Sequence, residues 1–190
     1  MTVIVGIKAE NRVLIGGDSA GVDGRLGLLI RSDPKVIQVR NMLLGFTSSF
    51  RMGQLLAHCL PGLAQPENDS DVFGWMVSTF IDAVRSTLKT GGFAERVNEV
   101  ESGGFFLVAY RGRLFEIGPD YQVGENADGY AAVGCADQIA LGALHATRDV
   151  EEHPERRIRA ALDAAEHFSA GVRGPFRIMA IDGAGAVETL

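Results

Sequence analysis

Thr2 follows the initiator methionine directly, and the β-branched run Val3-Ile4-Val5 follows the threonine. Threonine is small enough for a methionine aminopeptidase to remove Met1, which would leave Thr2 with a free α-amine. An α-amine has a pKa near ~8, so it is partly neutral at working pH and can take the proton of the adjacent hydroxyl. The start of the chain therefore predicts a threonine nucleophile that carries its own base. Alone this pattern is weak, because many proteins begin with Met-Thr and make no use of it.

Two charged residues further along the chain could support this chemistry. Asp18 ends an apolar strand expected over residues 13–18, and a hairpin with the strand expected over 3–8 would return its carboxylate to the region of Thr2. Lys35 opens another apolar strand, expected over 35–39. Asp18 and Lys35 could form a carboxylate–lysine pair beside Thr2, where a fixed ammonium lowers the cost of forming the alkoxide, but composition alone does not establish that geometry. Taken singly, Asp18 is an ordinary strand-end residue and Lys35 an ordinary surface lysine.

The sequence does not indicate other familiar sites. It contains no phosphate-binding glycine loop. Gly17-Asp18-Ser19-Ala20-Gly21 matches the letters G-x-S-x-G, but an expected loop and not a helix follows it, so we expect no nucleophile elbow of the serine hydrolases there. Cys135 as a nucleophile would need a lowered pKa and a histidine partner, and neither is visible. The four histidines lack ligand spacing: His58, His145, His153 and His167. We therefore expect no metal site and no cofactor.

Composition narrows the class of protein. The chain has 190 residues, of which 46% are hydrophobic and 22% charged, with a net charge of −6. Basic residues are scattered, so we expect neither a nucleic-acid partner nor a membrane surface. Two cysteines fit a reducing compartment, and no apolar stretch resembles a signal peptide or spans a bilayer. We expect one cytoplasmic domain over residues 1–190.

The apolar patterns predict strands, two helices, strands, two helices and strands, in that order. Strands are expected at 3–8, 13–18, 26–31, 35–39, 43–46, 105–110, 114–118, 122–124, 130–133, 176–181 and 187–190. Helices are expected at 50–60, 72–90, 137–147 and 154–169, and loops at 19–25 and 93–103. Runs of like elements favour an α+β fold in which two sheets face each other with helix pairs outside.

The two longest helices have one clear apolar face each. For 72–90, we expect a cap at Ser70 or Asp71 and an end at Gly91. Its expected apolar face comprises Phe73, Met76, Val77, Phe80, Ile81, Val84 and Leu88. The expected apolar face of 154–169 comprises Ile158, Ala161, Leu162, Ala165 and Phe168.

Six segments carry a resemblance that covers essentially the whole chain. They are Thr2 to Gly6, Val13 to Ser19, Lys35-Val36, Gly45 to Phe50, Ala132 to Asp137, and Glu166 to Ser169. The first three resemble the mature N-terminus, the second strand with its aspartate, and the catalytic lysine of one family. The last three resemble that family's oxyanion turn, its accessory-serine segment and its Asp-x-x-Ser motif. That family is the proteasome β-subunits, and the chain more closely resembles small bacterial or phage-like HslV-type members.

The resemblance implies the four-layer αββα sandwich of the N-terminal nucleophile hydrolases. It also implies a threonine peptidase that hydrolyses peptides or unfolded proteins through an acyl-enzyme, inside a homo-oligomeric ring that a separate ATPase unfoldase could feed. Thr2 would be the nucleophile, an amide near Ser48 would bind the oxyanion, and Glu166 and Ser169 would orient the amine. The implied site residues are Thr2, Asp18, Lys35, Ser48, Glu166 and Ser169.

Three departures from the family pattern leave alternatives open. Cys135 replaces the accessory serine, Glu166 replaces an aspartate, and Ser48 and Ser49 occupy a turn that is usually richer in glycine. A serine suits that turn if its φ is negative. Met1, if retained, would convert the amine of Thr2 to an amide and abolish the base. The alternatives are a catalytically silent structural subunit, and an amidase or acylase that acts on a small non-peptide amide.

Overall fold

The computed structural model describes residues 1–25, 27–97 and 100–190, so Leu26 of the expected strand 26–31 and residues 98–99 of the expected loop 93–103 lie outside the described residues. Within the described part are two five-stranded antiparallel sheets. The first has the order β12-β1-β2-β13-β14, with strands Tyr130–Gly134, Val3–Ala9, Arg12–Gly17, Arg177–Asp182 and Val187–Thr189. The second has the order β11-β10-β9-β6-β5, with strands Val123–Gly124, Arg113–Ile117, Phe106–Tyr110, Met42–Phe46 and Val36–Val39.

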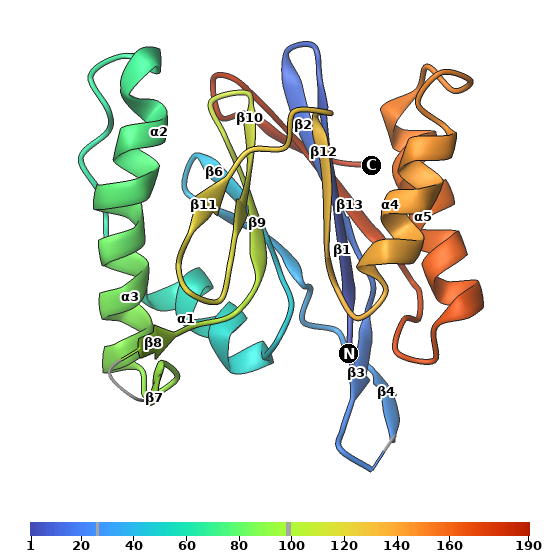
Figure 1. Ribbon diagram of the computed structural model, residues 1–190, viewed down its shortest axis with the longest axis horizontal. Coiled ribbons are helices and arrows are strands. Elements are labelled where there is room, and N and C mark those ends of the chain that lie inside the picture. Colours follow the sequence, from blue (N-terminus) through green and yellow to red (C-terminus); the bar gives the residue numbers. More distant parts are fainter. Residues whose placement is uncertain (26, 98–99) are drawn as a thin grey trace.

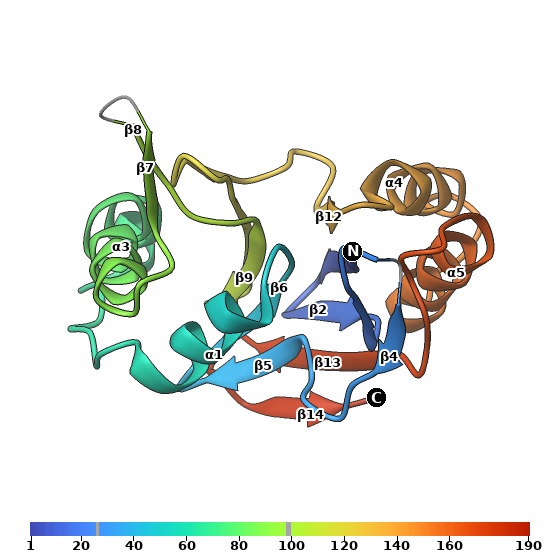
Figure 2. The same ribbon diagram turned by 90° about the horizontal axis from the view of Figure 1, so that it is seen from below.

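Helices cover the outer face of each sheet (Figures 1 and 2). The second sheet is covered by α1 (Phe50–Cys59), α2 (Val72–Trp75) and α3 (Ile81–Thr90), with a π-helical turn over Met76–Phe80 between the last two. The first sheet is covered by α4 (Asp137–Ala146) and α5 (Pro154–Phe168). The α+β class and the four-layer αββα sandwich expected from the sequence are confirmed.

Strands that are apolar on both faces separate the layers. Along β1, Val3 and Val5 pack toward α4 and α5, whereas Ile4 packs between the two sheets. Along β6, Leu44 packs toward α1 and α3, and Leu43 packs between the sheets. Because successive strand side chains point to opposite faces, a continuous apolar run marks a strand buried on both sides.

Two short hairpins include segments that were expected to be loops. β3 (Ala20–Val22), in the expected loop 19–25, pairs with β4 (Leu28–Ile30), which lies in the expected strand 26–31. β7 (Glu95–Val97) pairs with β8 (Val100–Ser102) where the sequence indicated only loop. β3, β7 and β8 have three residues each, too few for an apolar pattern to mark them, so composition alone does not reveal them.

The expected apolar face of 72–90 is wrong at its start, where Phe73 and Val77 are exposed and Val72 and Trp75 are buried. The π-helical turn changes the helical register, so regular spacing cannot hold across it. The N-cap of α2 is Asp71, one of the two residues expected, although its side chain makes no capping hydrogen bond. Asn68 caps the 3₁₀ turn Asp69–Asp71 that precedes α2, and its side chain accepts the Ser70 N–H.

At the end of α5, Phe168 is exposed although the pattern placed it on the buried face. It is the last residue of that helix, where the chain turns away from the sheet. Within the described residues, no helix has both the length and the apolar character needed to cross a bilayer. The N-terminus lies at the end of the sandwich from which the β3–β4 hairpin projects (Figure 1).

Candidate active site

Strand register places Asp18 beside the first residues of the chain. In the β1–β2 ladder Ile4 is opposite Gly17, so the residue after Gly17 lies next to Val3. The Asp18 Oδ1 atom accepts the Val3 N–H at 3.1 Å, and Oδ2 accepts the Ala20 N–H at 2.9 Å. These bonds fix the carboxylate at the end of β2, as the sequence predicted.

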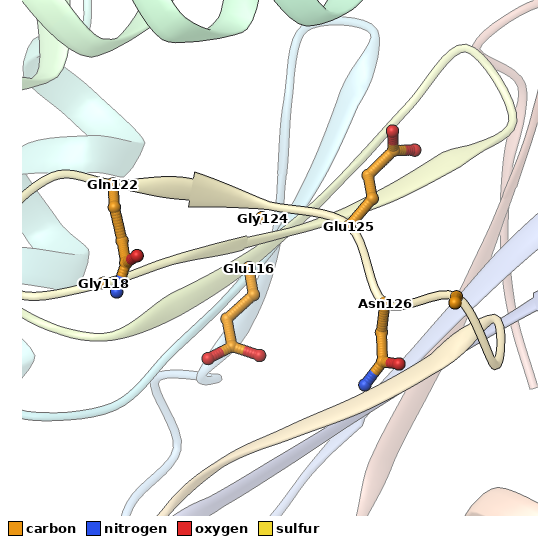
Figure 3. A pocket seen from close by; sticks show the side chains of 7 residues that line it. Glu116, Gly118, Gln122, Gly124, Glu125 and Asn126 are labelled. Carbon is orange, nitrogen blue, oxygen red and sulfur yellow. The ribbon is translucent and has the colours of Figure 1, made fainter.

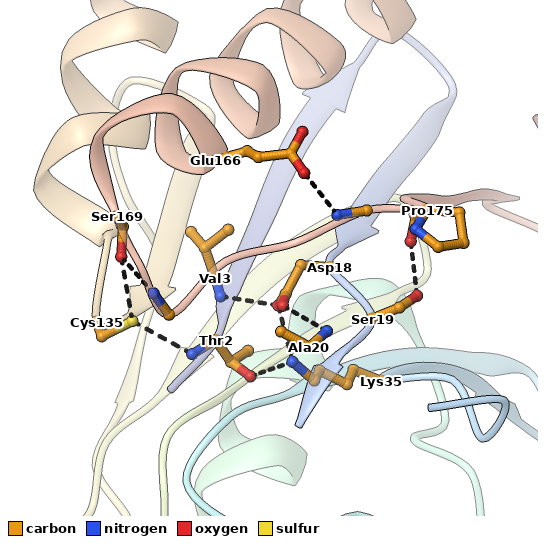
Figure 4. Close-up of polar contacts among 12 residues, drawn as sticks. Thr2, Val3, Asp18, Ser19, Ala20, Lys35, Cys135, Glu166, Ser169 and Pro175 are labelled. Carbon is orange, nitrogen blue, oxygen red and sulfur yellow. Dashed lines mark hydrogen bonds and ion pairs between the residues drawn. The ribbon is translucent and has the colours of Figure 1, made fainter. Parts of the chain in front are cut away.

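Lys35 reaches the same point from the other sheet (Figure 4). Its backbone carbonyl accepts the Phe46 N–H at 3.0 Å, which holds the residue at the start of β5. Its Nζ atom donates to Asp18 Oδ1 at 2.9 Å and also to Thr2 Oγ1. The three side chains predicted to meet, Thr2, Asp18 and Lys35, are therefore in direct contact.

This cluster is shielded from water. The Lys35 side chain is 2% exposed and that of Asp18 is 0% exposed. Burial lowers the pKa of Lys35 from its ordinary value, and the Asp18 carboxylate opposes that shift. An ammonium held against a hydroxyl in such surroundings stabilises the alkoxide far more than it would in water.

The turn after β12 holds the backbone of Thr2. The Thr2 carbonyl accepts the Cys135 N–H at 2.8 Å, and the Thr2 N–H donates to Cys135 Sγ at 3.3 Å. Gly134 has a φ of +120°, and a Cβ there would lie 2.2 Å from the Thr2 carbonyl oxygen. Only glycine allows this approach.

Ser48 differs from expectation, because its φ is +60° rather than negative. The Ser49 N–H donates to the Thr47 carbonyl at 2.6 Å, so Ser48 is the central residue of a γ-turn. Its Oγ accepts the Phe105 N–H at 3.1 Å, which helps to hold the turn. Within the described part of the chain, no acceptor takes the Ser48 N–H. A strained turn with a free amide is the arrangement expected of an oxyanion donor.

Glu166 does not make the expected contact with the Thr2 nitrogen. Its carboxylate accepts the Gly174 N–H at 2.9 Å, and Figure 4 shows it directed toward that segment. Ser169 is connected to Thr2 indirectly: its Oγ lies 3.9 Å from Cys135 Sγ, which in turn accepts the Thr2 N–H. Glu166 therefore holds the loop after α5, and Ser169 is connected to Thr2 only through the Cys135 Sγ atom.

Two cavities open beside Thr2, and both are also lined by Met1, Thr47 and Ser48. The Cys135 cavity, of about 320 Å³, is completed by Phe105, Glu116, Ala132, Val133, Gly134, Cys135 and Asp137. The Phe50 cavity, of about 80 Å³, is completed by Val22, Lys35, Phe46, Ser49 and Phe50. Loss of Met1 would enlarge both.

Sequence reasoning missed Phe105 and Glu116 in this site. Phe105 adjoins an ordinary apolar strand and Glu116 lies within one, so no sequence motif marks either residue as part of a site. Among the described residues, no group of three or more His, Cys, Asp or Glu side chains could hold a metal ion.

No protein-family model and no curated protein matches the sequence. Solved structures do match. BPH from Thiobacillus denitrificans, in complex with Epoxomicin, has a TM-score of 0.79 at 20% identity, covering 95% of this chain and 98% of that one. Eukaryotic HslV from Trypanosoma brucei has a TM-score of 0.67 at 19% identity, covering 95% and 99%. The chain has the HslV-type fold.

A third structure, Anbu (ancestral beta-subunit) from Yersinia bercovieri, has a TM-score of 0.67 at 13% identity, covering 99% of this chain and 87% of that one. At these identities the likeness is one of fold. The HslV-type fold spans nearly the whole chain, including the strands that bring Thr2, Asp18 and Lys35 together.

Proposed function

We propose that this chain is a threonine peptidase of the HslV-type family, active once Met1 is removed. The observation that carries the proposal is the position of Lys35 Nζ, which donates both to Asp18 and to Thr2 Oγ1. A lone Met-Thr start has many explanations, whereas a buried ammonium bridging a carboxylate and that threonine hydroxyl has few.

Acylation would begin with attack of Thr2 Oγ1 on a peptide carbonyl. The freed α-amine takes the hydroxyl proton, directly or through a water, and Lys35 stabilises the developing negative charge. The free N–H of Ser48, which lines both cavities with Thr2, donates to the oxyanion. Collapse of this intermediate breaks the C–N bond. The α-ammonium returns its proton to the leaving nitrogen, so an ester on Thr2 remains.

Deacylation uses the same groups in reverse. Water attacks the Thr2 ester with the α-amine as base, and the acid product leaves as the threonine hydroxyl is restored. The amine is oriented in this scheme by Cys135, whose Sγ accepts the Thr2 N–H at 3.3 Å and lies 3.9 Å from Ser169 Oγ. Sulfur is a weak acceptor, so it holds the amine less firmly than a hydroxyl would.

The proposal extends to substrate and assembly. Peptides or unfolded proteins would be the substrates, within a homo-oligomeric ring that a separate ATPase unfoldase could feed. The exposed Phe73 and Val77 on the outer helical layer support contacts between subunits. A cytoplasmic location is supported by the free thiols of Cys59 and Cys135, which a reducing compartment would preserve.

Peptide hydrolysis by Thr2→Ala and Thr2→Ser variants tests the proposal. All three residues are small enough to allow removal of Met1, so the variants differ mainly in the side chain at the attacking position. We expect Thr2→Ala to lose hydrolysis and adduct formation with epoxomicin, the compound bound in the BPH complex. Thr2→Ser should keep measurable hydrolysis. Full activity of Thr2→Ala would contradict the mechanism.

The contact between Glu166 and Gly174 favours one competing function, a silent structural subunit. In that case neither the wild type nor Thr2→Ser hydrolyses any amide, although Met1 is removed. Activity confined to small non-peptide amides would instead indicate an amidase or acylase.

A further inference from the structure

Glu116 is a charged group beside the proposed chemistry that the mechanism does not use. It lies on β10 and is half-buried, and no hydrogen bond or ion pair engages its carboxylate within the described ranges. Glu116 lines the Cys135 cavity together with Thr2. It also lines a neighbouring hollow, where Figure 3 shows its carboxylate directed away from its strand and Glu125 pointing to the opposite side. A half-buried carboxylate without a partner is costly, so a cationic partner would stabilise it.

Both charged side chains that line the Cys135 cavity among the described residues are acidic. Asp137, at the first turn of α4, also lines it, and none of the described residues that line it is a lysine or arginine. Burial raises the pKa of Glu116 from its ordinary value, and the nearby Asp137 carboxylate adds to that rise. Two carboxylates that repel each other favour a positive charge between them.

The position of the Thr2 nitrogen decides which part of a substrate enters this cavity. That nitrogen donates to Cys135 Sγ, and Cys135 lines this cavity but not the Phe50 cavity. In acylation the α-ammonium must deliver its proton to the leaving nitrogen. The leaving portion of the substrate therefore lies on the Cys135 side, and the acyl portion lies toward the Phe50 cavity with its apolar Val22, Phe46 and Phe50.

We propose that the Cys135 cavity binds a lysine or arginine side chain on the residue directly after the scissile bond, and that Glu116 determines this specificity. The inference rests on the proposed threonine peptidase function. The volume of about 320 Å³ is within the range of ligand pockets. Glu116 acts by ion pairing with the leaving portion and takes no part in bond breaking.

Internally quenched peptides that differ only in the residue after the scissile bond test this inference. The peptides carry lysine, leucine or glutamate at that position, and mass spectrometry of the products verifies that the same bond is cut. For the wild type, we expect kcat/KM to be roughly tenfold or more higher for the lysine peptide than for the leucine peptide, with the glutamate peptide slowest. Glu116→Gln should bring the lysine and leucine values close together, chiefly by lowering the value for the lysine peptide.

Two further variants sharpen the comparison. Glu152→Gln removes the same charge at an exposed position between α4 and α5, and should keep the full lysine preference. Asp137→Asn should reduce the preference less than Glu116→Gln, because Asp137 also accepts the Gln138 N–H at 2.6 Å. Far-UV circular dichroism verifies in each case that the variant is folded.

The outcomes separate this inference from the function on which it rests. Cleavage of all three peptides at similar rates, or a lysine preference that survives in Glu116→Gln, overturns the inference and leaves the peptidase intact. Absence of cleavage of any peptide by the Met1-free wild type overturns both.

Discussion

Lys35 and Asp18 come from different sheets, yet the Lys35 ammonium donates both to the Asp18 carboxylate and to the hydroxyl of Thr2. The hairpin of the first two strands predicted the position of Asp18, whereas the position of Lys35 beside Thr2 was expected from the family resemblance. The γ-turn at Ser48 and the actual partner of Glu166 could not be predicted in the same way. Both depend on loop conformations that are set by contacts with distant segments.

Asp18→Asn tests the buried pair. Loss of the Asp18 charge leaves the Lys35 ammonium buried without a counter-charge, which costs on the order of 3–5 kcal/mol of stability in proteins. We expect urea denaturation to show a destabilisation of that size, together with loss of peptide hydrolysis. Asp128→Asn, at an exposed residue, should change stability by less than about 0.5 kcal/mol and leave activity intact. Equal stability of the two variants would contradict the role given to Asp18.

Glu116 gives a prediction about pH. Its pKa is raised in the folded chain, so the folded state holds this proton more tightly than the unfolded state does. That contribution to stability is present below pH ~4.3 and is lost as pH rises through the raised pKa. Wild type and Glu116→Gln should therefore be similar in unfolding free energy near pH 4, and Glu116→Gln should be the more stable at pH 7. A wild type that is more stable at pH 7 would show that a partner already neutralises Glu116.

Among the elements, the pair β1 and β12 supports the site most directly. Their register brings Val3 opposite Gly134, and the turn that follows fixes Thr2. The apolar runs predicted both strands, but not that they pair with each other. The positive φ of Gly134 has no sequence signal beyond the glycine itself.

Gly134→Ala tests this support. The added methyl group would lie 2.2 Å from the Thr2 carbonyl oxygen, so Thr2 must move. We expect at least roughly a tenfold loss of kcat, since small displacements of reacting groups cost that much, and a destabilisation of about 1–3 kcal/mol. Gly112→Ala is the matched control: its φ is +68° and its Cβ would meet nothing within 4 Å. It should lose about 1 kcal/mol of stability with unchanged kcat. Similar kcat losses in both variants would point to a general effect on folding.

For the whole molecule, the order of strands and helices was enough to predict the four layers, because each apolar run is long and each helix pair follows a run of strands. The exposed apolar residues were harder to predict. Phe73 and Val77 were expected in the core, and the π-helical turn places them on the outer surface.

The oligomeric state of the purified chain can be predicted from these exposed residues. We expect the purified chain to form a large oligomer and the double variant Phe73→Asp with Val77→Asp to shift it toward smaller species, measured by native mass spectrometry. Val150→Asp alters an exposed apolar residue in the turn between α4 and α5 and should leave the oligomer intact. Dissociation by Val150→Asp alone would assign the contact to the α4–α5 layer.

The most direct test of the account compares two forms of the same chain, one without Met1 and one that retains it because methionine aminopeptidase was inhibited during expression. Intact mass identifies each form, and peptide hydrolysis is measured for both. We expect hydrolysis only by the form that begins with Thr2, since only that form has a free α-amine beside the hydroxyl. Equal hydrolysis by the form that retains Met1 would contradict the account.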